Sequence, residues 1–174
     1  MTNNKIYIVA NWKMFGNLNS LNSINNVINL SKIKKFKKTQ IIYCPPYTLL
    51  ESFIKKTKNS KILVGAQNCH KVQKAGSYTG SISSNMIKKI GCKYIILGHS
   101  ENRISGDTDT DINLKIKSSL NERLKIIFCI GETLNQKKTK KTFAVLRRQI
   151  LKGLKKVRSL QNVMIAYEPV WAIG

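Results

Sequence analysis

Six short apolar runs, separated by stretches with a different spacing, most constrain the fold of this 174-residue chain. Within each run, β-branched and aromatic residues predominate, which is typical of strands. The predicted strands are residues 5–10, 40–44, 61–66, 93–97, 125–130 and 163–167. Between strands, apolar residues return every three or four positions, which predicts helices over 18–28 and 143–157.

This alternation predicts an α/β fold, in which helices cover a sheet of parallel strands. The content of apolar residues, 42%, is enough to build a core and excludes an intrinsically disordered chain. No linker or low-complexity stretch divides residues 1–174, so we expect a single domain. The apolar runs are also too short to cross a bilayer, and residues 1–5 do not begin a secretory signal.

The four cysteines favour a reducing compartment. Cys44, Cys69, Cys92 and Cys129 lie far apart, without the paired spacing of redox or zinc sites. We expect buried, reduced thiols, a cytoplasmic location, and no metal. A metal site made of Cys44, Cys69, His70 and Cys129 is the alternative.

The positive charge has two explanations. Lys and Arg number 31 and Asp and Glu number 8, which leaves a net charge of +23. Basic clusters, such as residues 32–38 and 137–141, are typical of polyanion binders. Preference for AT-rich codons explains the same excess, because Lys, Asn and Ile are abundant throughout. No aromatic stacking pattern or base-reading motif accompanies the clusters, so we do not expect nucleic acid as a partner.

Polar residues lie within a few positions after the predicted strands. They are Asn11, Lys13, Gln67, Asn68, His99, Glu101, Glu132 and Glu168. The carboxyl ends of parallel strands share one edge, where α/β proteins bind ligands. A carboxylate, an imidazole and a lysine there can remove a proton next to a carbonyl. The absence of nucleotide-binding glycine motifs and of a nucleophile elbow argues against phosphate-loop and acyl-enzyme chemistry.

Five motifs at these strand ends resemble the triosephosphate isomerase family. They are Asn-Trp-Lys at 11–13, Gly-Ala-Gln-Asn at 65–68, Gly-His-Ser-Glu-Asn-Arg at 98–103, Cys-Ile-Gly-Glu at 129–132 and Ala-Tyr-Glu-Pro-Val-Trp-Ala-Ile-Gly at 166–174. The resemblance implies a TIM (β/α)8 barrel, here with about six of its eight units. It also implies a homodimeric enzyme of glycolysis and gluconeogenesis that interconverts dihydroxyacetone phosphate and D-glyceraldehyde 3-phosphate without a cofactor.

The resemblance also assigns roles at the strand ends. Glu168 would move the proton, and His99 would polarise the carbonyl; this family is a standard example of that pairing, so the roles are inherited from it. Lys13 would hold the charged substrate, and Asn11 would help to position Lys13 and the substrate. Further assignments are supporting residues Ser100, Glu101 and Cys129, substrate-binding Gly174, and a mobile lid of Pro169, Val170, Trp171, Ala172, Ile173 and Gly174.

Residues 67–80 resemble the loop by which each family subunit reaches its partner, with Thr79 at its tip. A plain surface loop is the alternative. Two residues depart from the family pattern. Ser81 replaces the usual glutamate, and Asn102 occupies a position that is commonly charged.

The length of the chain limits what the resemblance implies. A barrel of this type needs eight strands and typically about 250 residues. We therefore expect residues 1–174 to be a fragment of a complete gene, with unpaired strand edges near 6–10 and 163–167 and negligible isomerase activity alone. The alternatives are a catalytically silent truncated barrel, another sugar-phosphate barrel enzyme, and a basic polyanion-binding module.

Overall fold

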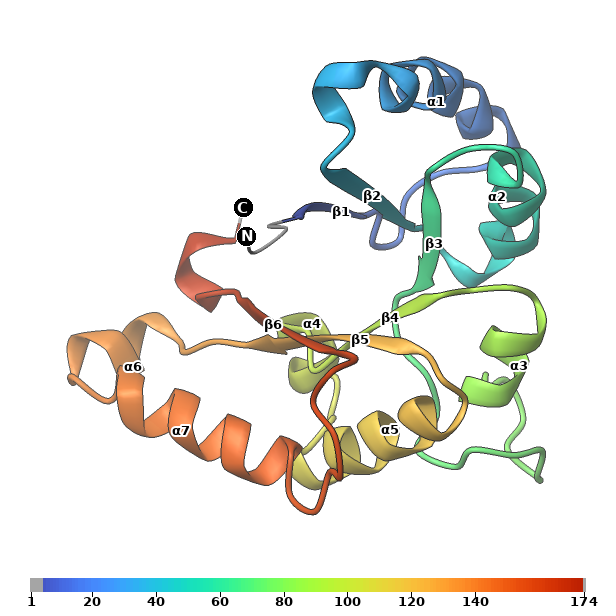
Figure 1. The fold of residues 1–174 in the computed structure, drawn as a ribbon. Helices are drawn as coiled ribbons and strands as arrows, with labels where there is room; N and C mark the ends of the chain where they lie inside the picture. Colours follow the sequence, from blue (N-terminus) through green and yellow to red (C-terminus); the bar gives the residue numbers. More distant parts are fainter. Residues whose placement is uncertain (1–4, 174) are drawn as a thin grey trace. The chain divides into compact units, whose positions relative to one another are not determined.

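The computed structural model describes residues 5–173 and divides into two compact units, which we treat separately (Figure 1). Unit 1 contains residues 5–67 and 87–95, and unit 2 contains residues 68–86 and 96–173. The assignments made to Gly174 lie outside the described residues. Single-domain organisation stays a prediction.

Unit 1 is built on parallel strands in chain order. These are β1 (Ile6–Asn11), β2 (Thr39–Cys44), β3 (Leu63–Ala66) and the first half of β4 (Tyr94–Leu97). The helices that connect them are η1 (Leu18–Ser23), α1 (Ile24–Lys32), η2 (Lys34–Phe36), η3 (Tyr47–Leu49) and α2 (Leu50–Thr57), and α3 (Ser84–Lys89) begins in unit 2 and ends in unit 1.

An aromatic cluster forms much of the core of unit 1. Phe53 of α2 is fully buried, and its ring centroid lies 4.9 Å from that of Trp12 and 5.7 Å from that of Tyr43. The pair of Phe53 with Trp12 is edge-to-face, and pairs of this kind add stability beyond the area that they bury. The close approach of β3 to β2 requires Gly65, because a Cβ there would lie 2.8 Å from the sulfur of Cys44.

Unit 2 is built on β5 (Lys125–Ile130) and β6 (Val163–Tyr167), which pair in parallel after the end of β4. Its helices are α4 (Ser100–Ile104), α5 (Asp109–Asn121), α6 (Leu134–Lys138), α7 (Thr142–Gly153) and η4 (Val170–Ala172). Helices α5 and α7 pack on each other and on β5. Their contact centres on Phe128 of β5, which is fully buried and lies so close to α7 that a Cβ on Gly153 would overlap its ring.

All six predicted strands are confirmed, with small differences at their ends. The prediction of a helix to residue 157 is wrong, because α7 ends at Gly153. The side-chain amide of Asn113 donates to the carbonyl oxygens of Gly153 and Lys155, at 2.8 and 3.0 Å, and these bonds hold the chain in a turn. Lys156 then takes a left-handed conformation, with φ of 57°, which no helix accommodates.

The described residues form no helix that is long and apolar enough to cross a membrane.

Strands β1 and β6 leave large apolar side chains in solvent. Ile6 and Ile8 are 61% and 52% exposed, and Ile165 and Tyr167 are 47% and 52% exposed. Each strand pairs on one side alone within the described residues. Exposed apolar edges of this kind are templates for association with another chain.

We therefore expect the chain to self-associate at micromolar concentration in sedimentation velocity. Ile6→Lys/Ile8→Lys reduces association, because charges at an edge oppose strand pairing. The matched control is Leu151→Lys/Leu160→Lys, which changes two exposed leucines outside the strands. A monomeric wild-type chain, or equal effects of the two variants, contradicts this prediction.

Candidate active site

The end of β4 presents a buried histidine. The chain turns at Gly98, whose φ of 77° favours glycine, and His99 then begins α4. The Nδ1 atom of His99 accepts a hydrogen bond from the backbone N–H of Glu101, at 3.3 Å. Because an accepting Nδ1 carries no proton, the neutral imidazole holds its N–H at Nε2.

The Nε2 atom of His99 faces Glu168, which directly follows β6. The distance from Nε2 to the Oε2 atom of Glu168 is 3.5 Å. The backbone N–H of Glu168 donates to the carbonyl oxygen of Ile130, at 2.8 Å, which fixes the end of β6 to that of β5. Within residues 5–173, the buried Oε2 has no hydrogen-bond partner. A buried acceptor without a donor is unusual and is available to take a proton.

Arg103 fixes the peptide that precedes His99. Its Nε donates to the carbonyl oxygen of Gly98 at 2.7 Å, and its Nη2 donates to that of Cys129 at 3.3 Å. Its Nη1 pairs with Asp109 at 2.7 Å. The guanidinium therefore joins the carboxyl ends of β4 and β5. Arg103 ends the motif that contains His99, but the sequence alone did not predict this role for it.

Gly131 lets β6 pass close to the end of β5. A Cβ on Gly131 would overlap the carbonyl oxygen of Glu168. The buried amide of Gln149 on α7 accepts from the N–H of Gly131 and donates to its carbonyl oxygen, both at 2.9 Å. The backbone position of Glu168 therefore depends on a glycine and on a distant helix.

Glu132 anchors the segment that follows Glu168. Its buried carboxylate accepts hydrogen bonds from the hydroxyl of Tyr167, at 3.1 Å, and from Nε1 of Trp171, at 3.0 Å. The ammonium of Lys137 lies 3.2 Å from the ring centroid of Trp171, on the same segment. Burial acts to raise the pKa of Glu132, but hydrogen bonds from Trp171, from the backbone, from Tyr167 and from Thr142 together outweigh it and lower that pKa. Glu132 therefore keeps its charge at neutral pH.

Because the charged carboxylate of Glu132 holds Trp171, we expect acid to release the segment that follows Glu168. Because the folded-state pKa of Glu132 lies below its unfolded value, its stabilising effect is complete above the unfolded pKa of about 4.3 and is lost as pH falls through the folded pKa. In a Trp12→Phe variant, where Trp171 is the remaining tryptophan, emission is expected to shift red below about pH 4. Adding Glu132→Gln should remove that transition. A transition that persists in the Gln variant contradicts the assignment.

Lys13 and Asn11 lie at the carboxyl end of β1 in unit 1. Lys13 has a φ of 52°, which is unfavourable for a residue with a side chain and typical of functional sites. Its N–H donates to Oδ1 of Asn11 at 3.0 Å, and its carbonyl oxygen accepts from Nε2 of Gln67 at 2.8 Å. Gln67 also donates to the carbonyl oxygen of Cys44, at 2.8 Å. Gln67 was predicted at this edge from the sequence, but its hydrogen bonds to two strand ends were not.

The structure thus brings His99, Ser100, Glu101, Cys129 and Glu168 together in unit 2. The Oε2 atom of Glu101 lies 3.4 Å from Nδ1 of His99. Ser100 is buried at the start of α4, and Cys129 takes part through its carbonyl oxygen. Asn11 and Lys13 form a separate group in unit 1.

The alternative metal site gains no support. The Sγ atom of Cys69 lies 3.6 Å from the hydroxyl of Ser119, and burial raises the pKa of this thiol to about 11. A thiol must lose its proton to bind a metal. Within residues 5–173, no three potential ligands form a group.

Thr79 is exposed in the loop that follows residue 67. In unit 2, the rings of His70 and Tyr78 stack with centroids 4.4 Å apart. Lys71 pairs with Asp111 of α5 at 2.8 Å, so the base of the loop is fixed to that helix.

Three comparisons with known proteins all point to one family. A family model described as triosephosphate isomerase matches residues 6–174. The triosephosphate isomerases of Alkaliphilus oremlandii and Treponema denticola are 39% and 42% identical over 173 residues, which cover 98% of this chain and 68% of each relative. The crystal structure of triosephosphate isomerase from Bartonella henselae has a TM-score of 0.88 at 35% identity, covering 96% of this chain and 69% of that one. The chain thus spans about two thirds of the length of these relatives.

Proposed function

Because this chain belongs to the triosephosphate isomerase family and has the parallel α/β fold of an incomplete TIM barrel, we propose that it interconverts dihydroxyacetone phosphate and D-glyceraldehyde 3-phosphate. The observation that carries the proposal is the 3.5 Å approach of Nε2 of His99 to the unpartnered Oε2 of Glu168. A base and an N–H donor at this separation can act on neighbouring atoms of one small substrate.

The reaction moves one proton between adjacent carbons. The carboxylate of Glu168 removes a proton from the carbon that bears the hydroxyl, while the Nε2–H of His99 donates a hydrogen bond to the neighbouring carbonyl oxygen. The electron pair from the broken C–H bond forms the C=C bond of an enediolate. His99 moves a proton between the two oxygens, and protonated Glu168 returns its proton to the former carbonyl carbon. The aldehyde forms as the ketone is lost, without net oxidation.

Other residues hold the substrate and the two reacting groups. The family motif assigns Lys13 to binding of the anionic substrate, and within unit 1 Asn11 fixes the backbone of Lys13. Glu101, Ser100 and Cys129 support the segment that carries His99. The assignment of Gly174 to substrate binding rests on the family motif alone.

Residues 169–173 act as a lid over the intermediate. The hydrogen bond from Trp171 to Glu132 holds this segment in the arrangement that the structure describes. Lids of this kind exclude water and protect reactive intermediates.

The active form is a homodimer in the cytoplasm, where the enzyme serves glycolysis and gluconeogenesis. The exposed loop with Thr79 is the segment that reaches the partner subunit. The family relationship and the fixed base of this loop support this proposal.

The test is a coupled assay of isomerase activity on two proteins. One is the 174-residue chain, and the other is this chain extended with the C-terminal third of the Alkaliphilus oremlandii relative, of which the match covers 68%. We expect negligible turnover from the first, because barrels of this type bind phosphate with loops after strands 7 and 8, and clear turnover from the second. A folded extended chain that does not isomerise either triose phosphate contradicts the proposed function.

A further inference from the structure

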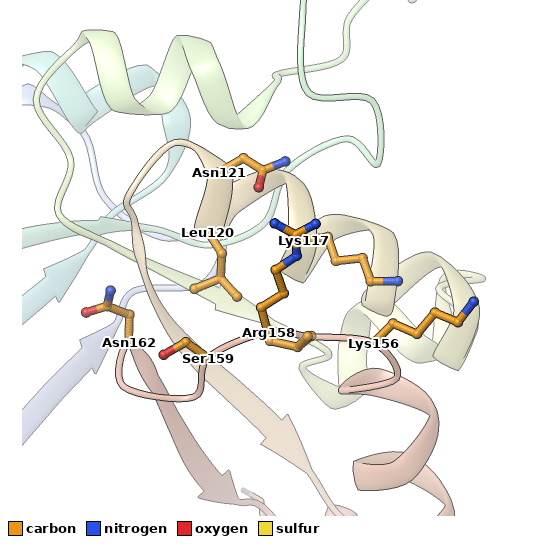
Figure 2. A pocket seen from close by; sticks show the side chains of 8 residues that line it. Lys117, Leu120, Asn121, Lys156, Arg158, Ser159 and Asn162 are labelled. Carbon is orange, nitrogen blue, oxygen red and sulfur yellow. The ribbon is translucent and has the colours of Figure 1, made fainter.

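We propose that unit 2 carries a second ligand site, which binds organic anions with at least two phosphate groups. The site is a cavity of about 480 Å³ at the amino-terminal ends of β5 and β6, whereas His99 and Glu168 follow the carboxyl ends of strands. It lies between the end of α5 and the segment that connects α7 to β6 (Figure 2). The lining residues are Lys117, Leu120, Asn121, Lys156, Val157, Arg158, Ser159 and Asn162.

The charged side chains that line this cavity are all positive. Lys117, Lys156 and Arg158 line it, and no Asp or Glu does. Within residues 5–173, none of these three side chains forms an ion pair or a hydrogen bond. Glu122 directly follows α5, and its carboxylate accepts a hydrogen bond from the side-chain amide of Gln73 at 2.7 Å. Three cations without partners match an anion of three or four charges, such as a diphosphate or a triphosphate.

The remaining lining residues suit an organic phosphate. Figure 2 shows Arg158 extending towards the end of α5, where Lys117 and Asn121 lie. Asn121, Ser159 and Asn162 offer amide and hydroxyl donors, and the half-buried Leu120 and Val157 offer apolar surface. The volume falls within the range of small-molecule sites. A ligand of nucleotide or sugar-bisphosphate size therefore fits the cavity in both size and charge.

The alternative is that the three cations stabilise the fold and bind no ligand, and it predicts a different effect of the substitutions. The carboxyl end of α5 has a partial negative charge, which attracts Lys117 and Arg158 whether or not a ligand binds. In that case, neutral substitutions lower stability without changing the affinity for phosphates. Binding and melting temperature must therefore be measured on the same variants.

The test is isothermal titration calorimetry of the 174-residue chain with tripolyphosphate and with ADP, both without magnesium. We expect one saturable site per chain. Lys117→Gln/Arg158→Gln should weaken binding at least about tenfold, since it removes two charged groups that would donate charge-assisted hydrogen bonds to the phosphates. The matched control, Lys34→Gln/Lys35→Gln, removes the same charge from unit 1 and should change affinity less than about twofold.

Three outcomes overturn the proposal. The first is the absence of saturable binding, and the second is an equal loss of phosphate affinity in both double variants. The third is tight binding of single-stranded RNA that Lys117→Gln/Arg158→Gln does not weaken. The last outcome would identify a diffuse polyanion surface instead. If the double variant does not fold, Ser159→Glu places a carboxylate on the exposed lining and must weaken binding to the same degree. None of these measurements depends on isomerase activity.

Discussion

Replacing Glu168 with Gln is expected to lower kcat by about 10³-fold or more, with little change in substrate affinity. Gln has the same size and can occupy the same position beside His99, but its amide cannot accept the substrate proton. The variant is measured in the extended chain by coupled assay, and substrate binding is measured separately by calorimetry. A loss confined to kcat identifies an interaction made in the transition state.

The control for this substitution is Glu51→Gln. Glu51 is an exposed carboxylate on α2 that pairs with Lys55 at 2.7 Å, and it lies in unit 1. Its replacement should leave both kcat and substrate binding unchanged. Near-normal turnover of a folded Glu168→Gln protein would remove Glu168 as the base.

Replacing Gly131 with Ala is expected to lower kcat/KM by about 10²-fold, although residue 131 carries no reacting group. The added Cβ would overlap the carbonyl oxygen of Glu168, so the end of β6 must move. A displacement of about 1 Å at a catalytic group can cost this much in rate. Circular dichroism should also show a lower melting temperature, because the hydrogen bonds between Gly131 and Gln149 are disturbed.

Gly106→Ala separates the displacement of Glu168 from loss of stability. Gly106 has a φ of 114°, so a side chain there is strained, but nothing lies within 4 Å of the added Cβ. This variant should melt at a lower temperature and keep its kcat/KM. If Gly131→Ala also keeps its kcat/KM, the position of Glu168 does not depend on the packing of Gly131.

Local sequence was sufficient to predict the strands and the candidate reacting groups. The apolar runs of β5 and β6 end where the structure ends these strands, and in β5 the burial of successive side chains fixes the parallel strand. His99 and Glu168 follow strands directly, so the strand ends and the family motifs sufficed to select them. Their mutual distance required the structure.

The supporting contacts could not be predicted, because they join residues that are distant in sequence. Gln149 meets Gly131 across 18 positions, and Trp171 meets Glu132 across 39. No periodicity marks a buried glutamine as the partner of a strand end, since its environment is set by how α7 packs on β5. The end of α7 at Gly153 likewise depends on Asn113, which lies on another helix.

The most direct test of proton transfer by Glu168 is an NMR measurement of deuterium incorporation. Dihydroxyacetone phosphate is incubated in D2O with the extended chain, and carbon-bound deuterium is followed over time. We predict incorporation at the carbon next to the carbonyl, because a protonated Glu168 exchanges with solvent before it returns its proton. We predict that Glu168→Gln abolishes this incorporation. Equal incorporation by the two proteins, or isomerisation that persists in the variant, would contradict the account.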